Sequence, residues 1–234
     1  MGIDKVTDLK KLLLFDIDGT LVDTGGTGFP ALQLALSDGF GIQDDLSHIS
    51  LAGATDTNLC REILTFHQIE PTAANMAHYL DGYLFHLQKL MPEKSGRVLP
   101  GILELLEKLQ ERPELVVALL TGNLIRGAEI KLDHFGIWHF FEFGAFADDH
   151  HVRNELGHFA KARALEKHGT EFPPESIYVI GDTPKDIACG RAIGAQTVAV
   201  ATGEYSLEEL EKFTPDFLFK DFSATAQALE KLGW

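Results

Sequence analysis

Asp16 and Asp18, two positions apart, are the clearest candidates in this sequence for a catalytic or metal-binding pair. They follow an apolar run at residues 12–15 and precede Gly19, which is typical of a buried strand that ends in a tight turn. Open α/β sheets hold their ligands at the carboxyl ends of strands. One carboxylate at such a place can attack a substrate or hold a metal ion, and the other can transfer a proton.

A second pair of aspartates follows another apolar run, residues 177–180. The predicted strand ends in Gly181-Asp182, and Asp186 lies one helical turn further on, near the start of a predicted helix. Hard oxygen ligands of this kind suit Mg²⁺, which takes few carboxylates and keeps several waters. Asp186 could instead be only a favourable acid in the first turn of its helix.

Thr121, Gly122 and Asn123 close a third apolar run, residues 115–120. A hydroxyl followed by backbone amides can form a small anion cradle at the start of a helix. The same three residues can also act as an ordinary helix cap. From these residues alone both interpretations stay open.

A site for an anionic substrate would need local positive charge, because the formal net charge of −15 repels anions at long range. We expect Arg153 to lie in a loop after a strand at residues 141–147, on the ligand side of the sheet. Lys161 and Arg163 fit a solvated helix face better. His150 and His151 fit a loop surface better than a zinc site, because no partner Cys or His has the required spacing.

The composition limits the class of protein and its partners. A chain of 234 residues with 45% hydrophobic and 24% charged residues is typical of a globular protein. No apolar run approaches the ~20 residues that span a bilayer, and the N-terminus lacks the apolar stretch of a signal peptide. Two distant cysteines favour the cytoplasm, and the acidic charge argues against nucleic acid and anionic membranes as partners.

Apolar runs and helical patterns alternate along most of the chain, which predicts a doubly wound, mainly parallel sheet of the α/β class. The expected strands cover residues 12–15, 115–120, 141–147, 177–180, 197–200 and 217–219. The expected helices cover residues 102–110, 125–135, 156–168, 185–193, 206–212 and 224–232.

One interval interrupts this alternation. Residues 28–94 contain three helical patterns, at residues 31–40, 56–67 and 72–90, and are too long for a simple crossover. We therefore expect an α/β core at residues 1–23 and 96–234, with an all-helical subdomain inserted at residues 24–95. Such an insert next to Asp16 would overhang the carboxylates as a lid.

Over nearly its whole length the chain resembles hydrolases of the haloacid dehalogenase superfamily, in the phosphoglycolate-phosphatase-like group. Asp-Ile-Asp-Gly-Thr-Leu-Val is similar to the first motif of that family, Leu-Thr-Gly-Asn to the second and Gly-Asp-Thr-Pro-Lys-Asp-Ile to the fourth. The resemblance implies a Rossmann-like core with a mobile helical cap.

The resemblance also implies residue roles. Asp16 would be the nucleophile that becomes an aspartyl-phosphate, and Asp18 would be the general acid and base. Mg²⁺ would be held by Asp16, the Asp18 backbone carbonyl and Asp182, with Asp186 supporting it through water or from the second shell. Thr121 would bind the phosphoryl group, together with Gly122 and Asn123.

Two positions depart from the pattern of the family. The third motif commonly has Lys-Pro and, six residues after the Lys, an aromatic or aliphatic residue. Here Arg153-Asn154 takes that place and Phe159 follows at the right distance, which favours Arg153 over Lys161 as the phosphate-neutralising cation. Ala54 stands where a cap loop often carries a basic residue, which weakens the case for a carboxylated substrate.

The expected function is that of a Mg²⁺-dependent phosphatase acting on a small phosphorylated metabolite, as a monomer or homodimer. A phosphomutase of the same superfamily shares the core residues and remains an alternative. A non-catalytic binding protein with the same fold is a third interpretation, and the imperfect third motif is the one feature that favours it.

Overall fold

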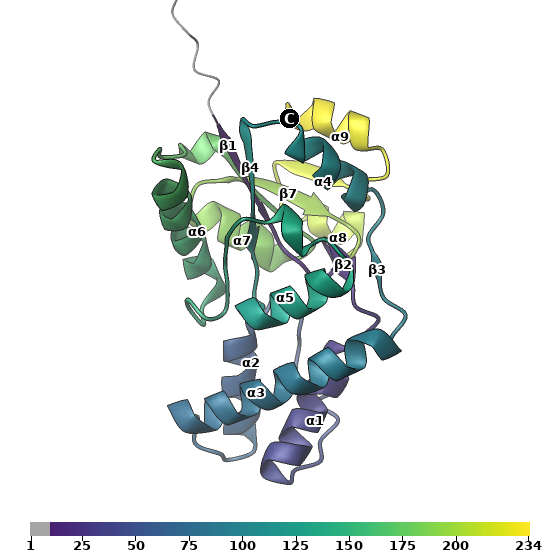
Figure 1. The fold of residues 1–234 in the computed structure, drawn as a ribbon, viewed down its shortest axis with the longest axis vertical. Coiled ribbons are helices and arrows are strands. Elements are labelled where there is room, and N and C mark those ends of the chain that lie inside the picture. Colours follow the sequence, from purple (N-terminus) through teal and green to yellow (C-terminus); the bar gives the residue numbers. More distant parts are fainter. Residues whose placement is uncertain (1–9) are drawn as a thin grey trace, which may run out of the picture.

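The central strand of the sheet, β1 (Lys11–Phe15), has fully buried side chains from Leu12 to Phe15. Strands buried on both faces are typical of parallel sheets that are covered by helices on each side. The computed structural model, which describes residues 10–234, has this arrangement (Figure 1). The predicted doubly wound, mainly parallel sheet is therefore confirmed.

The six-stranded sheet has the order β5-β4-β1-β6-β7-β8, and all its pairings are parallel. From β1 the chain runs outward on one side and then returns to build the other side. The carboxyl ends of β1, β4 and β6 are therefore neighbours, and this is where open sheets bind ligands. The other five strands are β4 (Leu115–Leu120), β5 (Gly144–Ala145), β6 (Ile177–Gly181), β7 (Gln196–Val200) and β8 (Phe217–Phe219).

The two faces of the sheet are covered by different helices. Leu13 and Phe15 belong to one apolar cluster, which includes residues of α4 (Ile102–Gln110), α5 (Ile125–His134) and α9 (Thr225–Leu232). Leu12 and Leu14 belong to another, with residues of α6 (Arg153–His168) and α7 (Pro184–Ala192). The alternation of side chains along β1 thus stabilises both layers at once. The short α8 (Leu207–Glu211) packs near the sheet edge at β8, where Leu210 shares a small apolar cluster with Ala199 and Leu218.

The helical insert lies at one end of the core (Figure 1). It consists of α1 (Gly28–Phe40), α2 (Asp56–Phe66) and α3 (Ala73–Leu90), and these helices share an apolar cluster of their own. A two-stranded antiparallel ribbon, β2 (Val22–Asp23) with β3 (Arg97–Val98), pairs the two chain segments that lead into and out of it. Helix α5 lies between the two parts, because Leu124 and Ile130 join the insert cluster while Ala128 and Leu132 join the core cluster.

Two local predictions are wrong. The strand expected at residues 141–147 is reduced to β5, because this edge segment pairs only with Leu119 and Leu120, and the chain then turns where Asp149 accepts the Phe146 N–H. Arg153 is not in a loop but is the first residue of α6, which begins three residues before the predicted helix.

The part of the chain that the structure describes contains no helix long and apolar enough to cross a membrane. The expectation that no signal peptide is present concerns mainly residues 1–9, which lie outside the described residues.

Replacing Leu13 by Ala is expected to lower the free energy of unfolding by about 2–5 kcal/mol, because it opens a cavity in the central strand. The matched control is Leu103→Ala on α4, whose side chain is 48% exposed. We expect the control to stay within about 0.5 kcal/mol of the wild type in urea unfolding. Equal losses in the two variants would contradict the burial described here.

Candidate active site

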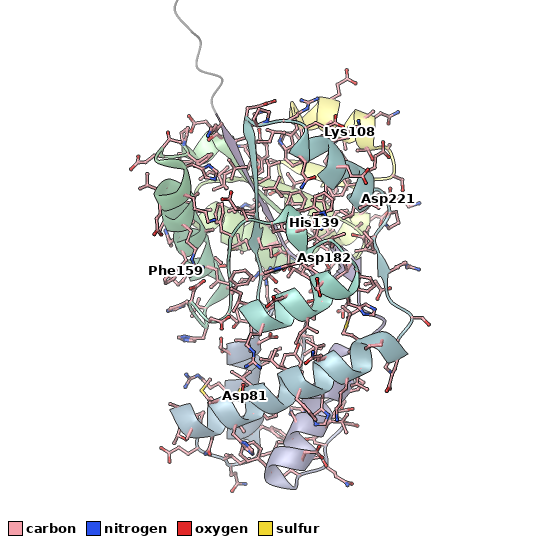
Figure 2. The ribbon with its side chains drawn as sticks, in the orientation of Figure 1. Asp81, Lys108, His139, Phe159, Asp182 and Asp221 are labelled. Atoms are coloured by element: carbon pink, nitrogen blue, oxygen red, sulfur yellow. The ribbon has the colours of Figure 1, made fainter. Side chains whose placement is uncertain are left out.

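The ends of β1, β4 and β6 bring the predicted residues together. Asp16 follows β1, Thr121 follows β4 and Asp182 follows β6, and these three side chains are buried. Figure 2 shows Asp182 at the end of the core that faces the helical insert, away from Lys108 and Asp221. A cavity of about 420 Å³ lies here, lined by Asp16, Asp18 and Asp182 from the core and by residues of the insert.

Three carboxylates converge beneath this cavity. Asp16, Asp182 and Asp186 each offer an oxygen, and these oxygens lie within 4.8 Å of one another. Burial raises the pKa of Asp16 to about 6 although Arg153 acts to lower it. Burial also raises the pKa of Asp182 well above its ordinary value, and the neighbouring Asp186 and Asp16 add to the shift. Such a cluster favours a bound cation, since a cation would relieve both the burial and the mutual repulsion.

Gly19 lets the turn after Asp18 approach the cluster closely. Its φ of +76° is left-handed, and a Cβ added there would lie 2.3 Å from Asp182 Oδ2. The next residue, Thr20, donates a hydrogen bond of 3.0 Å to Asp182 Oδ1. A glycine is therefore required at this position for both its backbone conformation and the lack of space.

Arg153 is the cation closest to the cluster. Its guanidinium lies 3.0 Å from Asp16 Oδ2 and also binds Asp186 Oδ1. Burial acts to lower the pKa of Arg153, but Asp16 and Asp186 more than offset this, so the side chain stays charged. Lys161 lies further along α6, partly exposed and outside the cavity lining. Arg163, expected to be solvated, instead forms an ion pair with Asp149.

Asp186 uses its carboxylate in two ways. Oδ2 accepts hydrogen bonds from the N–H and the hydroxyl of Thr183, which makes a capping box at the start of α7. Oδ1 binds Arg153. The first-turn interpretation of Asp186 and its place near the site are therefore both seen in the structure.

Lys131, which none of the sequence motifs indicated, is the second cation of the site. Its ammonium group donates to Asp18 Oδ2 and to Asn123 Oδ1, each at 2.6 Å. The Asn123 side-chain amide also donates to Asp18 Oδ2, at 2.9 Å. Asp18 is thus held by two donors, from the β4–α5 loop and from α5.

A signal for Lys131 was present in the sequence. The predicted helix at residues 125–135 places it one position before Leu132 and three after Ala128, on the face that packs against the core. A lysine on the buried face of a helix is rarely found without a partner. Only the fold shows that this partner is Asp18, which lies 113 residues away.

The expected anion cradle is only partly available. Helix α5 begins at Ile125, so Thr121–Asn123 form a turn before the helix rather than its start. The Asn123 N–H donates to the Thr121 hydroxyl, and the Thr121 N–H donates to the Ala145 carbonyl. The Thr121 hydroxyl also hydrogen-bonds Asp16 and acts to lower its pKa. Thr121 therefore positions the nucleophile candidate from inside a fully buried turn.

The insert touches the core next to this turn. Asp56 donates its N–H to the Gly122 carbonyl at 2.7 Å, and its Oδ2 accepts the Leu124 N–H at 2.8 Å. A Cβ added to Gly122 would lie 1.9 Å from the Ala54 carbonyl oxygen, so only glycine permits this contact. The Thr55 side chain caps α2 and also donates to the His151 carbonyl.

Sequence comparison agrees with the geometry. The family profile described as haloacid dehalogenase-like hydrolase matches residues 13–200, most of the chain. This chain belongs to the haloacid dehalogenase-like hydrolases. The resemblance drawn from the motifs is therefore confirmed, and the matched range begins within β1 and ends with β7.

Individual proteins are similar to this chain over nearly its whole length. The sequence is 26% identical to a probable phosphatase, IndB, of Dickeya dadantii, over 96% of this chain and 96% of that protein. It is 27% identical to a phosphoglycolate phosphatase of Agrobacterium fabrum, over 96% of this chain and 94% of that protein. A solved β-phosphoglucomutase of Clostridium difficile shares the fold, with a TM-score of 0.73, 21% identity and coverage of 96% and 97%.

Mg²⁺ is expected to raise the thermal unfolding midpoint of the wild type, by roughly 2–4 °C per kcal/mol of binding free energy. The effect should be larger at about pH 7.5 than at about pH 5, since the pKa of Asp16 is raised to about 6 and protons then compete for its carboxylate. Without Mg²⁺, a carboxyl whose pKa rises on folding stabilises the fold at low pH and loses this contribution as the pH passes about 6.

Asp182→Asn should abolish the Mg²⁺ shift, whereas Asp133→Asn, at an exposed position on α5, should retain it. Differential scanning fluorimetry measures both. An undiminished shift in Asp182→Asn would contradict a metal site at this cluster.

Proposed function

We propose that this protein hydrolyses a small phosphomonoester with the help of Mg²⁺, through an aspartyl-phosphate on Asp16. The chain is a phosphoric monoester hydrolase, as its hydrolase family and its likeness to phosphatases over nearly its full length indicate. The observation that carries the mechanism is the buried cluster at the strand ends, in which Asp16 faces Arg153, Asp182 and the cavity.

Asp16, Asp182 and the Asp18 backbone carbonyl would hold the metal ion. Asp186 supports the same site through Arg153, because its own oxygens already bind Thr183 and that guanidinium. When bound, Mg²⁺ supplies positive charge that neutralises the phosphoryl oxygens. The acidic oxygens of this cluster are the donor type that Mg²⁺ prefers.

Each residue of the site has a separate role in the proposed reaction. The Asp16 carboxylate attacks phosphorus, and Arg153 beside it offsets the charge of the phosphoryl oxygens. Asp18 protonates the leaving alcohol and later removes a proton from the water that attacks the phosphoenzyme. Gly122 and Asn123, from the turn after β4, line the cavity and would contact the phosphoryl group, whereas the buried Thr121 would act through its hydrogen bond to Asp16.

We assign Lys131 as a positioning residue for Asp18. Its contact and that of Asn123 both fall on Oδ2, which leaves Oδ1 of Asp18 for proton transfer. Because Lys131 is buried on α5, the core holds one oxygen of the partly exposed Asp18 carboxyl. Proton transfer depends strongly on such alignment.

The insert at residues 24–95 would act as a cap on the core at residues 1–23 and 96–234. Its loop already contacts the turn at Gly122, so it can exclude water during phosphoryl transfer and admit it for hydrolysis. We also propose a cytoplasmic location, with Cys60 and Cys189 buried as free thiols. A small phosphorylated metabolite is the expected partner.

A phosphomutase remains the second candidate, because the β-phosphoglucomutase fold is similar and the core residues needed are the same. The two functions differ in the fate of the phosphoenzyme. Release of inorganic phosphate from several esters supports hydrolysis, and isomerisation of a sugar phosphate supports transfer. A non-catalytic binding protein would show neither.

Asp16→Asn is expected to lower phosphate release from p-nitrophenyl phosphate by at least ~10³-fold, because an amide cannot serve as the nucleophile. Asp18→Asn should lower it by ~10²–10⁴-fold through loss of proton transfer. Phosphate release is measured with Mg²⁺, and Asp133→Asn serves as the matched control. Equal turnover by Asp16→Asn and the wild type would rule out this mechanism.

Lys131→Met is expected to lower kcat by ~10–100-fold with KM changed little, because Asp18 loses a donor while phosphate binding is retained. Lys131→Arg should restore part of kcat. Lys161→Met, which removes a partly exposed lysine outside the cavity lining, is the control and should behave as the wild type. A rise in KM at constant kcat would show instead that Lys131 binds substrate.

A further inference from the structure

The insert contributes an apolar surface to the cavity. Phe29 and Leu32 come from α1, Leu51 from the loop before α2, Leu59 from α2 and Tyr83 from α3. All three insert helices therefore face the phosphate site with carbon-rich side chains. Burial, with Asp56 and Asp18 nearby, keeps the pKa of Tyr83 well above its ordinary value, so its hydroxyl stays neutral and can donate a hydrogen bond.

Acidic side chains outnumber basic ones around the cavity. Six lining side chains are acidic, namely Asp16, Asp18, Asp23, Asp56, Asp182 and Glu204. Among the described residues, the lysines and arginines of the lining are only two, Lys131 and Arg153. A Mg²⁺ ion and a phosphoryl dianion bring equal and opposite charges, so their arrival leaves this imbalance unchanged.

Both cations are already engaged. Arg153 binds Asp16 and Asp186, and Lys131 binds Asp18 and Asn123. Neither cation belongs to the insert. A second anionic group on the substrate would therefore lie near Phe29, Leu32 and Leu51, where it would lose hydration without gaining a cation as its partner. It would also face Asp56, which adds a negative charge on the insert side.

We propose that the preferred substrate is a phosphomonoester of an uncharged alcohol with an apolar body, and that esters carrying a carboxylate, such as 2-phosphoglycolate, are poor substrates. This inference rests on the proposed phosphatase function and sharpens it. The cavity of about 420 Å³ is of the size that holds small-molecule ligands, so the alcohol extends beyond one or two carbons. Similarity to phosphoglycolate phosphatases thus does not carry over to the substrate.

The direct test compares 2-phosphoglycolate with its carboxamide, which differs mainly in charge. For the wild type with Mg²⁺ we expect kcat/KM for the carboxamide to exceed that for the acid by at least about tenfold, because the pocket repels a second anion. An equal or higher kcat/KM for the acid overturns the inference while leaving the phosphatase function intact. Absence of phosphate release from both esters and from p-nitrophenyl phosphate overturns the phosphatase function and the inference together.

The second test introduces a positive charge into the insert. Leu51→Lys places a cation in the apolar lining, and Leu51→Gln is the matched polar control of similar length. Relative to Leu51→Gln, the lysine variant should shift the ratio of kcat/KM values toward the acid by about tenfold or more. An identical ratio in the two variants would contradict an electrostatic origin of the selectivity.

Discussion

The ion pair of Arg153 with Asp16 and Asp186 is the interaction on which the rest of the site depends. Burying several carboxylates at one sheet edge is costly unless a cation compensates them. Arg153 spans two of them from the first residue of α6, and Thr20 donates to the third, Asp182. The raised pKa values of Asp16 and Asp182 show that this compensation is incomplete. The remaining imbalance is what a divalent cation can remove.

A second, separate ion pair holds Asp18, the group that we propose as the general acid and base. Lys131 reaches Asp18 from α5, and α5 packs against both the core and the insert. Helix α5 therefore holds Asp18 through Lys131, follows the turn that contains Thr121, and packs against the insert. The missing side chain at Gly19 leaves room for the Asp182 carboxylate, and the missing side chain at Gly122 lets the Ala54 carbonyl of the insert approach the core.

The reaction and the preference for one substrate depend on different parts of the structure. The core supplies the groups proposed for phosphoryl transfer, because its carboxylates and Arg153 lie at strand ends that the parallel topology brings together. The insert offers the surface that meets the rest of the substrate, and here that surface is apolar and carries Asp56 but no lysine or arginine among its lining residues. Two proteins can therefore share the chemistry and differ in the ester that they prefer.

Much of the fold could be predicted because its signals are local. The strand at residues 115–120 and the helix at residues 102–110 have the predicted bounds, since a continuous apolar run and a 3.6-residue period each specify one structure. Prediction failed at the sheet edge, where β5 is shorter than its apolar run, because pairing with β4 and not composition determines its length. It also misplaced Arg153, because no side chain caps α6 and its start therefore has no clear sequence signal.

The sequence by itself determined the type of chemistry: Asp16, Asp18, Thr121 and Asp182 each follow an apolar run, and their motifs identify the family. Only the tertiary structure decided how those groups are partnered. It placed Lys131 against Asp18 and Arg153 against Asp16, contacts between residues more than a hundred positions apart. It also collected the apolar lining from three helices of the insert. The physical reason is that local periodicity specifies elements, whereas ion pairs and cavity walls arise only where distant elements meet.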